Sequence, residues 1–302
     1  MPSTPFTRPT AILLLLGLGI CFGANHVAAR VAFDNGVGIT TAILARSGLT
    51  ALVLLAVIAW QRVRIPATRP HIGWVLLSGG LIALQSLCLY SAVARIPVAL
   101  ALLVFNTMPV VYALLTWALG GKRPTGRAVL YMGVILLGLA LALDTWARLQ
   151  GHGPLQPGFA LGVGFAFAAA VLISSALWVT ENRMPTVPGV LRSQWAMSLV
   201  FVCMLAVGQT QLLPGGMAWP HNALGWWGLA GLVACYGTAF SLWFIWLARL
   251  DMARNASAMN IEPVAALVLA WVFLGQSLTA SQLLGALVVV TGIVLLARLP
   301  TA

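Results

Sequence analysis

Acidic side chains are scarce in this sequence, where five Asp and Glu residues stand among 302, against sixteen Arg and Lys. Charged residues of both signs make up only 7% of the chain. Soluble globular domains carry about 25%. The mean hydropathy is +1.00. So few charges cannot keep a protein surface in water, so these values exclude a soluble protein and predict an all-α integral membrane protein surrounded by lipid.

Motifs for catalysis and nucleotide hydrolysis are also missing. The chain has no G-x-x-x-x-G-K-[ST], which excludes ATP hydrolysis by this chain, and no HExxH, G-x-S-x-G or pair of catalytic carboxylates. No helix carries the periodic arginines of a voltage sensor, and no TVGYG-like channel filter occurs. The cysteines lie in apolar runs without metal-ligand spacing. We therefore predict a protein that is not an enzyme and needs neither metal nor other cofactor.

The apolar runs predict ten membrane-spanning helices, because the hydrocarbon core of a bilayer requires about 20 apolar residues per helix. The first run follows Arg8 and continues to Val31, which favours a retained helix over a cleaved signal peptide. The gaps are short and rich in turn residues, so none can hold a soluble catalytic domain. The runs are 11–31, 39–60, 73–94, 98–119, 127–144, 159–180, 192–212, 224–248, 255–274 and 281–298.

The basic residues lie in the gaps between these runs. A nucleic-acid-binding protein would cluster them on one polar face, so the pattern excludes a nucleic-acid partner. With the N-terminus inside, twelve of the sixteen basic residues fall in or beside cytoplasmic gaps. The positive-inside rule therefore predicts that both termini are cytoplasmic.

The chain also contains an internal repeat, which appears when it is aligned with itself at a shift of 154 residues. Two apolar segments share Leu and Val by composition, but seldom Asn, Pro, Trp, Gly and Thr in one register. We expect two related units, 1–150 and 151–302. The aligned pairs are Arg95 with Arg249, Asn106 with Asn260, Pro109 with Pro263, Val110 with Val264, Trp117 with Trp271, Gly121 with Gly275 and Thr125 with Thr279.

The two units are predicted to cross the membrane in opposite directions. The gap around Lys122 and Arg123 is basic, whereas the equivalent gap 276–281 has no charge. Each unit has five helices, an odd number, so the second unit enters from the other face. The sequence thus predicts a 5+5 inverted-topology repeat, the architecture of alternating-access carriers.

Asn-x-x-x-Pro in the fourth helix of each unit predicts a broken helix, at Asn106 with Pro109 and at Asn260 with Pro263. Proline removes a backbone donor, and the freed backbone must find partners inside the protein. Matching interruptions in two halves indicate a central binding site. The alternative is a plain kink with a tolerated polar residue.

Several motifs resemble the EamA branch of the drug/metabolite transporter superfamily. They are Glu262-Pro263-Val264 followed by Leu274-Gly275, Gly23-Ala24-Asn25-His26, Ala42–Arg46, and Leu89-Tyr90-Ser91-Ala92 before Arg95. This sequence differs in having Gln276 after the Leu-Gly pair and Met108 at the position equivalent to Glu262. The resemblance implies ten helices in a bacterial inner membrane and the export of small metabolites, with amino-acid exporters as the best-known members.

Ionisable residues at membrane depth are costly and suggest function. Glu262 is a candidate for proton coupling or for binding a substrate ammonium, and alternatively for a structural ion pair. Asn25 and His26 follow two glycines that permit close helix approach, and the histidine could relay a proton or simply be a hydrogen-bonded core residue. Arg30 and Arg46 could bind a substrate carboxylate or form structural pairs.

Aromatic residues could line a cavity, with helix or lipid packing as the alternative. We expect Tyr90 and Trp178 first, and then Trp243, to do so, from the deeper aromatic residues Trp117, Trp178, Trp195, Trp243, Trp246, Trp271, Tyr90 and Tyr236. The expected function is secondary-active or facilitative export of small polar metabolites, most simply amino acids including aromatic ones. The alternatives are efflux of cationic or lipophilic drugs, and an intramembrane enzyme or scramblase. A monomer and a homodimer are both compatible with the sequence.

Overall fold

The computed structural model describes residues 6–63, 71–143, 158–210, 216–246, 250 and 261–299. Every regular element of these ranges is a helix. Eight helical segments of the described part are long and apolar enough to cross a membrane, with 98–118 counted as one segment, and two shorter apolar helices lie at 126–142 and 262–274. The chain is therefore a multi-pass helical membrane protein, as its composition predicts.

Each expected span overlaps a described helix, and the fourth overlaps two. The helices are α1 (Arg8–Asp34), α2 (Ile39–Gln61), α3 (Ile72–Val93), α4 (Val98–Phe105), α5 (Met108–Ala118), α6 (Gly126–Ala142), α8 (Phe159–Arg183), α9 (Gly189–Gln209), α10 (Ala223–Trp246), α12 (Glu262–Leu274) and α13 (Ala280–Ala297).

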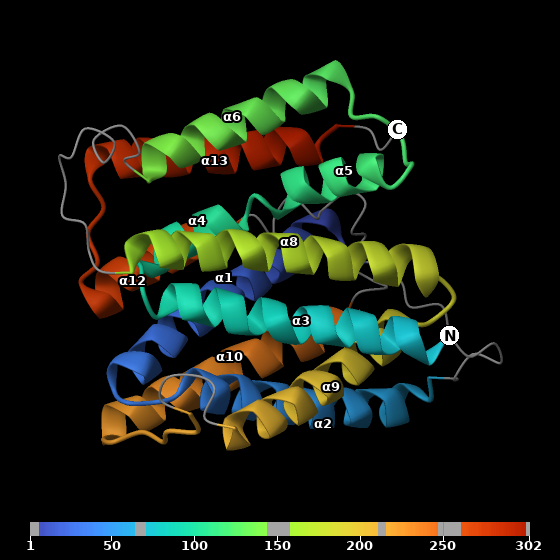
Figure 1. Cartoon of the computed structure of the whole chain (residues 1–302), viewed down its shortest axis with the longest axis vertical. Coiled ribbons are helices and arrows are strands. Elements are labelled where there is room, and N and C mark those ends of the chain that lie inside the picture. The colour runs from blue at the N-terminus through green and yellow to red at the C-terminus, as the bar shows by residue number, and fades with distance from the viewer. Residues whose placement is uncertain are drawn as a thin grey trace.

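The helices lie roughly side by side and alternate in direction along the chain (Figure 1). The most extensive packing joins α1 to α10, α3 to α8, α6 to α13 and α2 to α9. Each of these pairs combines one helix from residues before 150 with one from after it. Pair α6–α13 forms one edge of the bundle, and α2 with α9 lies at the opposite edge (Figure 1).

Helix α4 occupies the centre of the bundle. Seven of its eight residues are buried, and it contacts α8 and α12. A helix that is apolar on every side is stable only when other helices surround it. In contrast, Val110 is the one buried residue of α5, so the chain passes from the core to the lipid-facing surface between these two helices.

The fourth span is interrupted at Asn106-Thr107. Pro109 has no backbone N–H to donate to the carbonyl of Phe105, which is where α4 ends. Two side chains provide donors at the break, since Asn106 Nδ2 donates to the Leu102 carbonyl at 2.8 Å and Thr107 Oγ1 to that of Val104 at 2.7 Å.

In the second unit α12 begins at Glu262, with Pro263 in its first turn. Asn260, the predicted partner of Asn106, lies outside the described residues. Helices α6 and α13 begin in the same way, because Thr125 and Thr279 are their N-caps and accept hydrogen bonds from the Ala128 and Gln282 backbone amides. These two threonines are equivalent in the sequence repeat.

Candidate functional site

A cavity of about 330 Å³ lies in the middle of the bundle, between helices of both units. Its volume is within the usual range for small-molecule sites. Three of its side chains are of the acidic or basic types that carry charge in proteins, namely His26, Arg46 and Glu262. The other lining residues are Phe22 from α1, Gln85 and Leu89 from α3, Phe105 from α4, Ile173 from α8, and Tyr236, Phe240 and Trp243 from α10.

The acidic group of this cavity is Glu262, whose carboxylate Oε1 lies 3.6 Å from His26 Nε2. Glu262 is the first residue of α12, where the unpaired backbone N–H groups favour a negative charge. Its side chain remains 23% exposed, whereas that of His26 is 6% exposed. A cation in the cavity can therefore reach the carboxylate.

Helix α1 approaches the start of α12 closely at Gly23. A Cβ atom at this position would lie 2.9 Å from the carbonyl oxygen of Glu262 and 3.0 Å from the amide nitrogen of Ala266. Only a glycine permits this approach without displacing backbone. The sequence Gly23-Ala24-Asn25-His26 thus positions the histidine beside the carboxylate.

The basic group of the cavity is Arg46, which is 4% exposed and lies between two tyrosine rings. Its guanidinium carbon is 4.7 Å from the ring centre of Tyr90 and 4.1 Å from that of Tyr236. Arg46 Nη1 donates to Tyr90 Oη at 3.1 Å and Nη2 to Ser86 Oγ at 2.9 Å. Tyr90 Oη in turn donates to Asn25 Oδ1 at 3.1 Å. Four helices thereby hold one arginine in place.

The predicted site residues divide into two groups. Asn25, His26, Tyr90, Arg46, Trp243 and Glu262 come together, with Tyr90 and Asn25 fully buried behind Arg46. Among the remaining predicted residues, Arg30, Asn106 and Trp178 do not line the cavity, and Asn260 lies outside the described residues. Arg30 Nε contacts both carboxylate oxygens of Asp34 at 2.9 Å, and its Nη1 donates to the Val93 carbonyl, so it joins the ends of α1 and α3.

Trp178 does not line the cavity but lies near the guanidinium of Arg183, 5.7 Å from ring centre to carbon. Asn106 caps α4, and its neighbour Phe105 is the residue that reaches the cavity. Trp117 and Trp271, which are equivalent in the repeat, are 47% and 63% exposed on the lipid-facing surface.

Sequence reasoning missed Gln85 and Ser86. Gln85 lines the cavity and Ser86 bonds Arg46, and both are buried. The signal was available, because an amide and a hydroxyl stand next to each other in the middle of the apolar run of α3.

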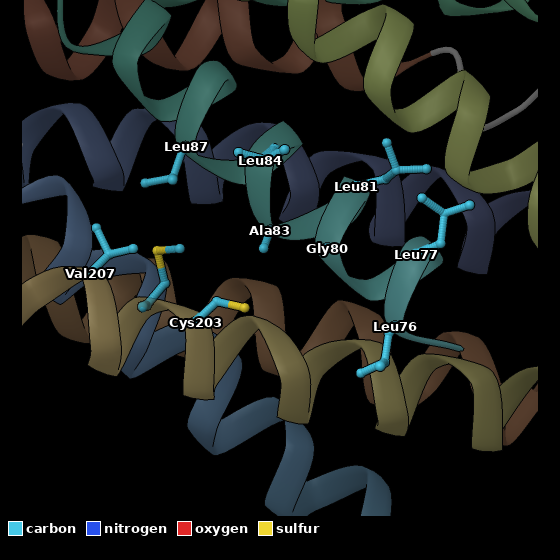
Figure 2. Close-up of a pocket in the computed structure, with 10 residues that line it drawn as sticks. Leu76, Leu77, Gly80, Leu81, Ala83, Leu84, Leu87, Cys203 and Val207 are labelled. Atoms are coloured by element: carbon cyan, nitrogen blue, oxygen red, sulfur yellow. The ribbon is translucent and has the colours of Figure 1, made fainter. Parts of the chain in front are cut away.

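A second recess of about 380 Å³ lies between α3 and α9 and differs in chemistry. Figure 2 shows that its lining side chains carry no nitrogen or oxygen atom, and it includes Leu76, Leu84, Cys203 and Val207. Leu76 and Leu84 are more than half exposed. Such a recess suits a lipid chain and offers nothing to a polar solute.

Comparison with known protein families matches one family model to this chain twice. The EamA-like transporter family matches residues 9–143 and again residues 159–298. The chain belongs to the EamA-like transporter family.

Among its relatives is an uncharacterised transporter of Synechocystis sp., 26% identical over 313 residues that cover 94% of this chain and 92% of the relative. The threonine/homoserine exporter RhtA of Salmonella typhimurium is 25% identical, covering 93% and 88%. RhtA of Escherichia coli is 26% identical with the same coverage. A solved crystal structure superimposes with a TM-score of 0.63 at 21% identity, over 97% of this chain and 99% of the other, so the two chains share a fold.

Proposed function

We propose that this EamA family member exports small zwitterionic metabolites, amino acids first among them, by alternating access. The observation that carries the proposal is that one central cavity contains a cation, Arg46, from the first unit and an anion, Glu262, from the second. A zwitterion carries the complementary pair of charges. The relatives named as threonine/homoserine exporters support a substrate of this kind.

Alternating access requires two halves that move against each other around the site. We infer an inverted 5+5 repeat with a boundary near residue 150. The packing of the helices supports this inference. In the repeat, α1 corresponds to α8, α2 to α9, α3 to α10, and the pair α4 and α5 to α12. When each helix is exchanged for its partner, the α1–α10 contact becomes α8–α3, α2–α10 becomes α9–α3, and α1–α12 becomes the α8 contacts with α4 and α5, all of which occur. The α2–α9 and α6–α13 pairs are each converted into themselves, as a two-fold axis demands.

Membrane orientation follows from the same inference. The gaps after α2, α5 and α8 share one end of the bundle. They carry Arg62, Lys122 and Arg123, and the helix turns beside them carry Arg127 and Arg183. We assign this end and both termini to the cytoplasm of a bacterial cell with the protein in its inner membrane. The opposite end, with Arg30 and Arg95, is then periplasmic.

Cysteine labelling tests this orientation. Ser277→Cys is expected to react with a membrane-impermeant maleimide on intact spheroplasts, and Arg123→Cys only after permeabilisation, because the two gaps lie at opposite ends of the bundle. The four native cysteines lie within helices α1, α3, α9 and α10, and the unmodified protein measures their background. Labelling of both sites from the same side would refute the inverted repeat.

In this mechanism the cavity residues bind and release the substrate without covalent chemistry. The carboxylate of Glu262 attracts the ammonium group, and His26 stabilises that carboxylate while the cavity is empty. A proton on Glu262 would weaken ammonium binding, so proton coupling at this pair is part of the proposal. The phenyl and indole rings of Phe22, Phe240 and Trp243 provide an apolar wall for substrate side chains.

Counterflow in proteoliposomes tests the function. Vesicles preloaded with unlabelled threonine are expected to accumulate labelled threonine several-fold above empty vesicles and above vesicles without protein. Homoserine and aromatic amino acids are tested as the unlabelled partner. Failure of every amino acid would contradict the proposal.

Efflux of cationic or lipophilic drugs is the second candidate. The aromatic wall beside Glu262 favours it, since rings and a carboxylate suit an organic cation. The buried Arg46 in the same cavity opposes it, because a second cation would repel the drug. Exchange of a labelled drug cation without any amino-acid exchange would establish this alternative. An intramembrane enzyme or scramblase has no further observation in its favour.

A further inference from the structure

The arginine of the cavity is a buried cation without an acidic partner. Among the described residues the ion pairs are His26 with Glu262 and Arg30 with Asp34, so no described carboxylate lies within 4 Å of the Arg46 guanidinium. A charge removed from water is costly unless a counter-charge or several hydrogen bonds stabilise it. Arg46 is 4% exposed. Groups other than these carboxylates must therefore stabilise the charge of Arg46.

The two tyrosines stabilise the Arg46 cation but leave some of its N–H donors without an acceptor in the described part of the chain. The guanidinium carbon lies over both ring faces, 4.7 Å from the centre of Tyr90 and 4.1 Å from that of Tyr236. A guanidinium has five N–H donors. Two of them are engaged, by Tyr90 Oη and Ser86 Oγ, and five minus two leaves three.

The buried Nε atom is among the donors left without a partner in the described part of the chain. Asn25, whose Oδ1 accepts a hydrogen bond from Tyr90, also has a buried Nδ2 atom without a partner in the described part of the chain. Buried donors are seldom left unpaired, because each then loses its hydrogen bonds to water. These unpaired N–H groups require an oxygen acceptor. Because Arg46 lines the cavity, a bound substrate can provide one.

We propose that Arg46 is the anchor for the carboxylate of the transported substrate, and that Tyr90 and Tyr236 are positioning residues that orient its guanidinium edge toward the cavity. The carboxylate would receive two in-plane N–H donors, the geometry in which arginine binds carboxylates best. This inference rests on the proposed export of zwitterions and adds the specificity determinant. Amines that lack the carboxylate leave the buried cation uncompensated and are rejected.

Paired substrates test the anchor directly. Wild-type protein in counterflow is expected to prefer threonine over threonine amide, in which a neutral carboxamide replaces the carboxylate, by about thirtyfold or more, the range found when one partner of a buried charge pair is removed. Arg46→Gln is expected to reduce this preference to less than about threefold. Arg46→Lys, which keeps the charge but loses the planar donors, is expected to lie between them.

Arg95→Gln is the matched control. Arg95 also lies over an aromatic ring, that of Phe165 at 5.1 Å, and donates to the Ser91 carbonyl, but it does not line the cavity. Its replacement is expected to leave the preference unchanged. A purely structural Arg46 would lower exchange of threonine and its amide equally, and that result would overturn the anchor.

Two further outcomes keep the inferences separate. If Arg46→Gln does not yield a monodisperse protein, wild type alone decides, because equal exchange of threonine and threonine amide refutes the anchor while the proposed amino-acid export stands. If wild type exchanges drug cations but no amino acid, the proposed function fails and the anchor fails with it.

Discussion

Replacing Gly285 by leucine is expected to abolish the folded protein, with loss of the monodisperse peak in detergent. A Cβ atom at Gly285 would lie 2.3 Å from the amide nitrogen of Ala142 and 2.6 Å from the carbonyl oxygen of Gly138. These contacts are with backbone of α6, so rotation of a side chain cannot relieve them. Helices α6 and α13 would have to separate along their main interface, where small residues provide the close packing on which membrane helices depend.

Gly133→Leu is the matched control, because Gly133 lies on α6 itself and a Cβ atom there meets nothing within 4 Å. It is expected to fold and to keep its thermal transition. The alanine pair sharpens the comparison. Gly133→Ala should leave the melting temperature unchanged or higher, since alanine favours a helix by about 1 kcal/mol over glycine. Gly285→Ala should lower it, and equal behaviour of the two variants would show that the α6–α13 contact is not as close as described.

Glu262→Gln is expected to lower amino-acid exchange by about thirtyfold or more while the protein remains folded. Glutamine keeps the size of the side chain and removes the charge that faces the substrate ammonium and His26. If Glu262 carries the coupling proton, the remaining exchange also loses its dependence on pH. The measurement is counterflow of labelled threonine between pH 5.5 and 8.5, with melting temperature as the check of folding.

Glu181→Gln provides the same chemical change outside the cavity. Glu181 lies near the end of α8, accepts a hydrogen bond from Tyr112 and does not line the cavity. Its replacement is expected to leave exchange within about twofold of wild type, as for most exposed charges. Unchanged exchange in Glu262→Gln would make the His26–Glu262 pair structural and would remove the main support for ammonium binding.

Much of the fold follows from local properties of the sequence. Apolar length defined the spans, because lipid requires each crossing to be a helix of about 20 residues. Proline chemistry located the interruption near Asn106, since Pro109 cannot donate to Phe105. Even the fifth helices begin at the threonines that the repeat aligned. Such features depend on a few neighbouring residues and on the solvent alone.

The site was predictable only in part. Asn25, His26, Arg46 and Glu262 were identified because a polar group in lipid is costly and conspicuous. Trp178 was expected before Trp243, yet of these two tryptophans, each within a long apolar helix, only Trp243 lines the cavity. From the sequence, Arg30 and Arg46 could each bind a substrate carboxylate or form a structural pair. The packing of the helices places Arg30 beside Asp34 and Arg46 between two tyrosines.

The sequence by itself therefore determined the membrane environment, the spans, the repeat and the polar residues that merit attention. Only the tertiary structure decided which of those residues meet, because that depends on how each helix is rotated against its neighbours. The rotation is set by close contacts such as Gly23 on the first turn of α12, and glycine spacing alone does not specify the partner helix. Arg46, Tyr90, Tyr236 and Asn25 come from four helices, and their assembly is a property of the packed bundle.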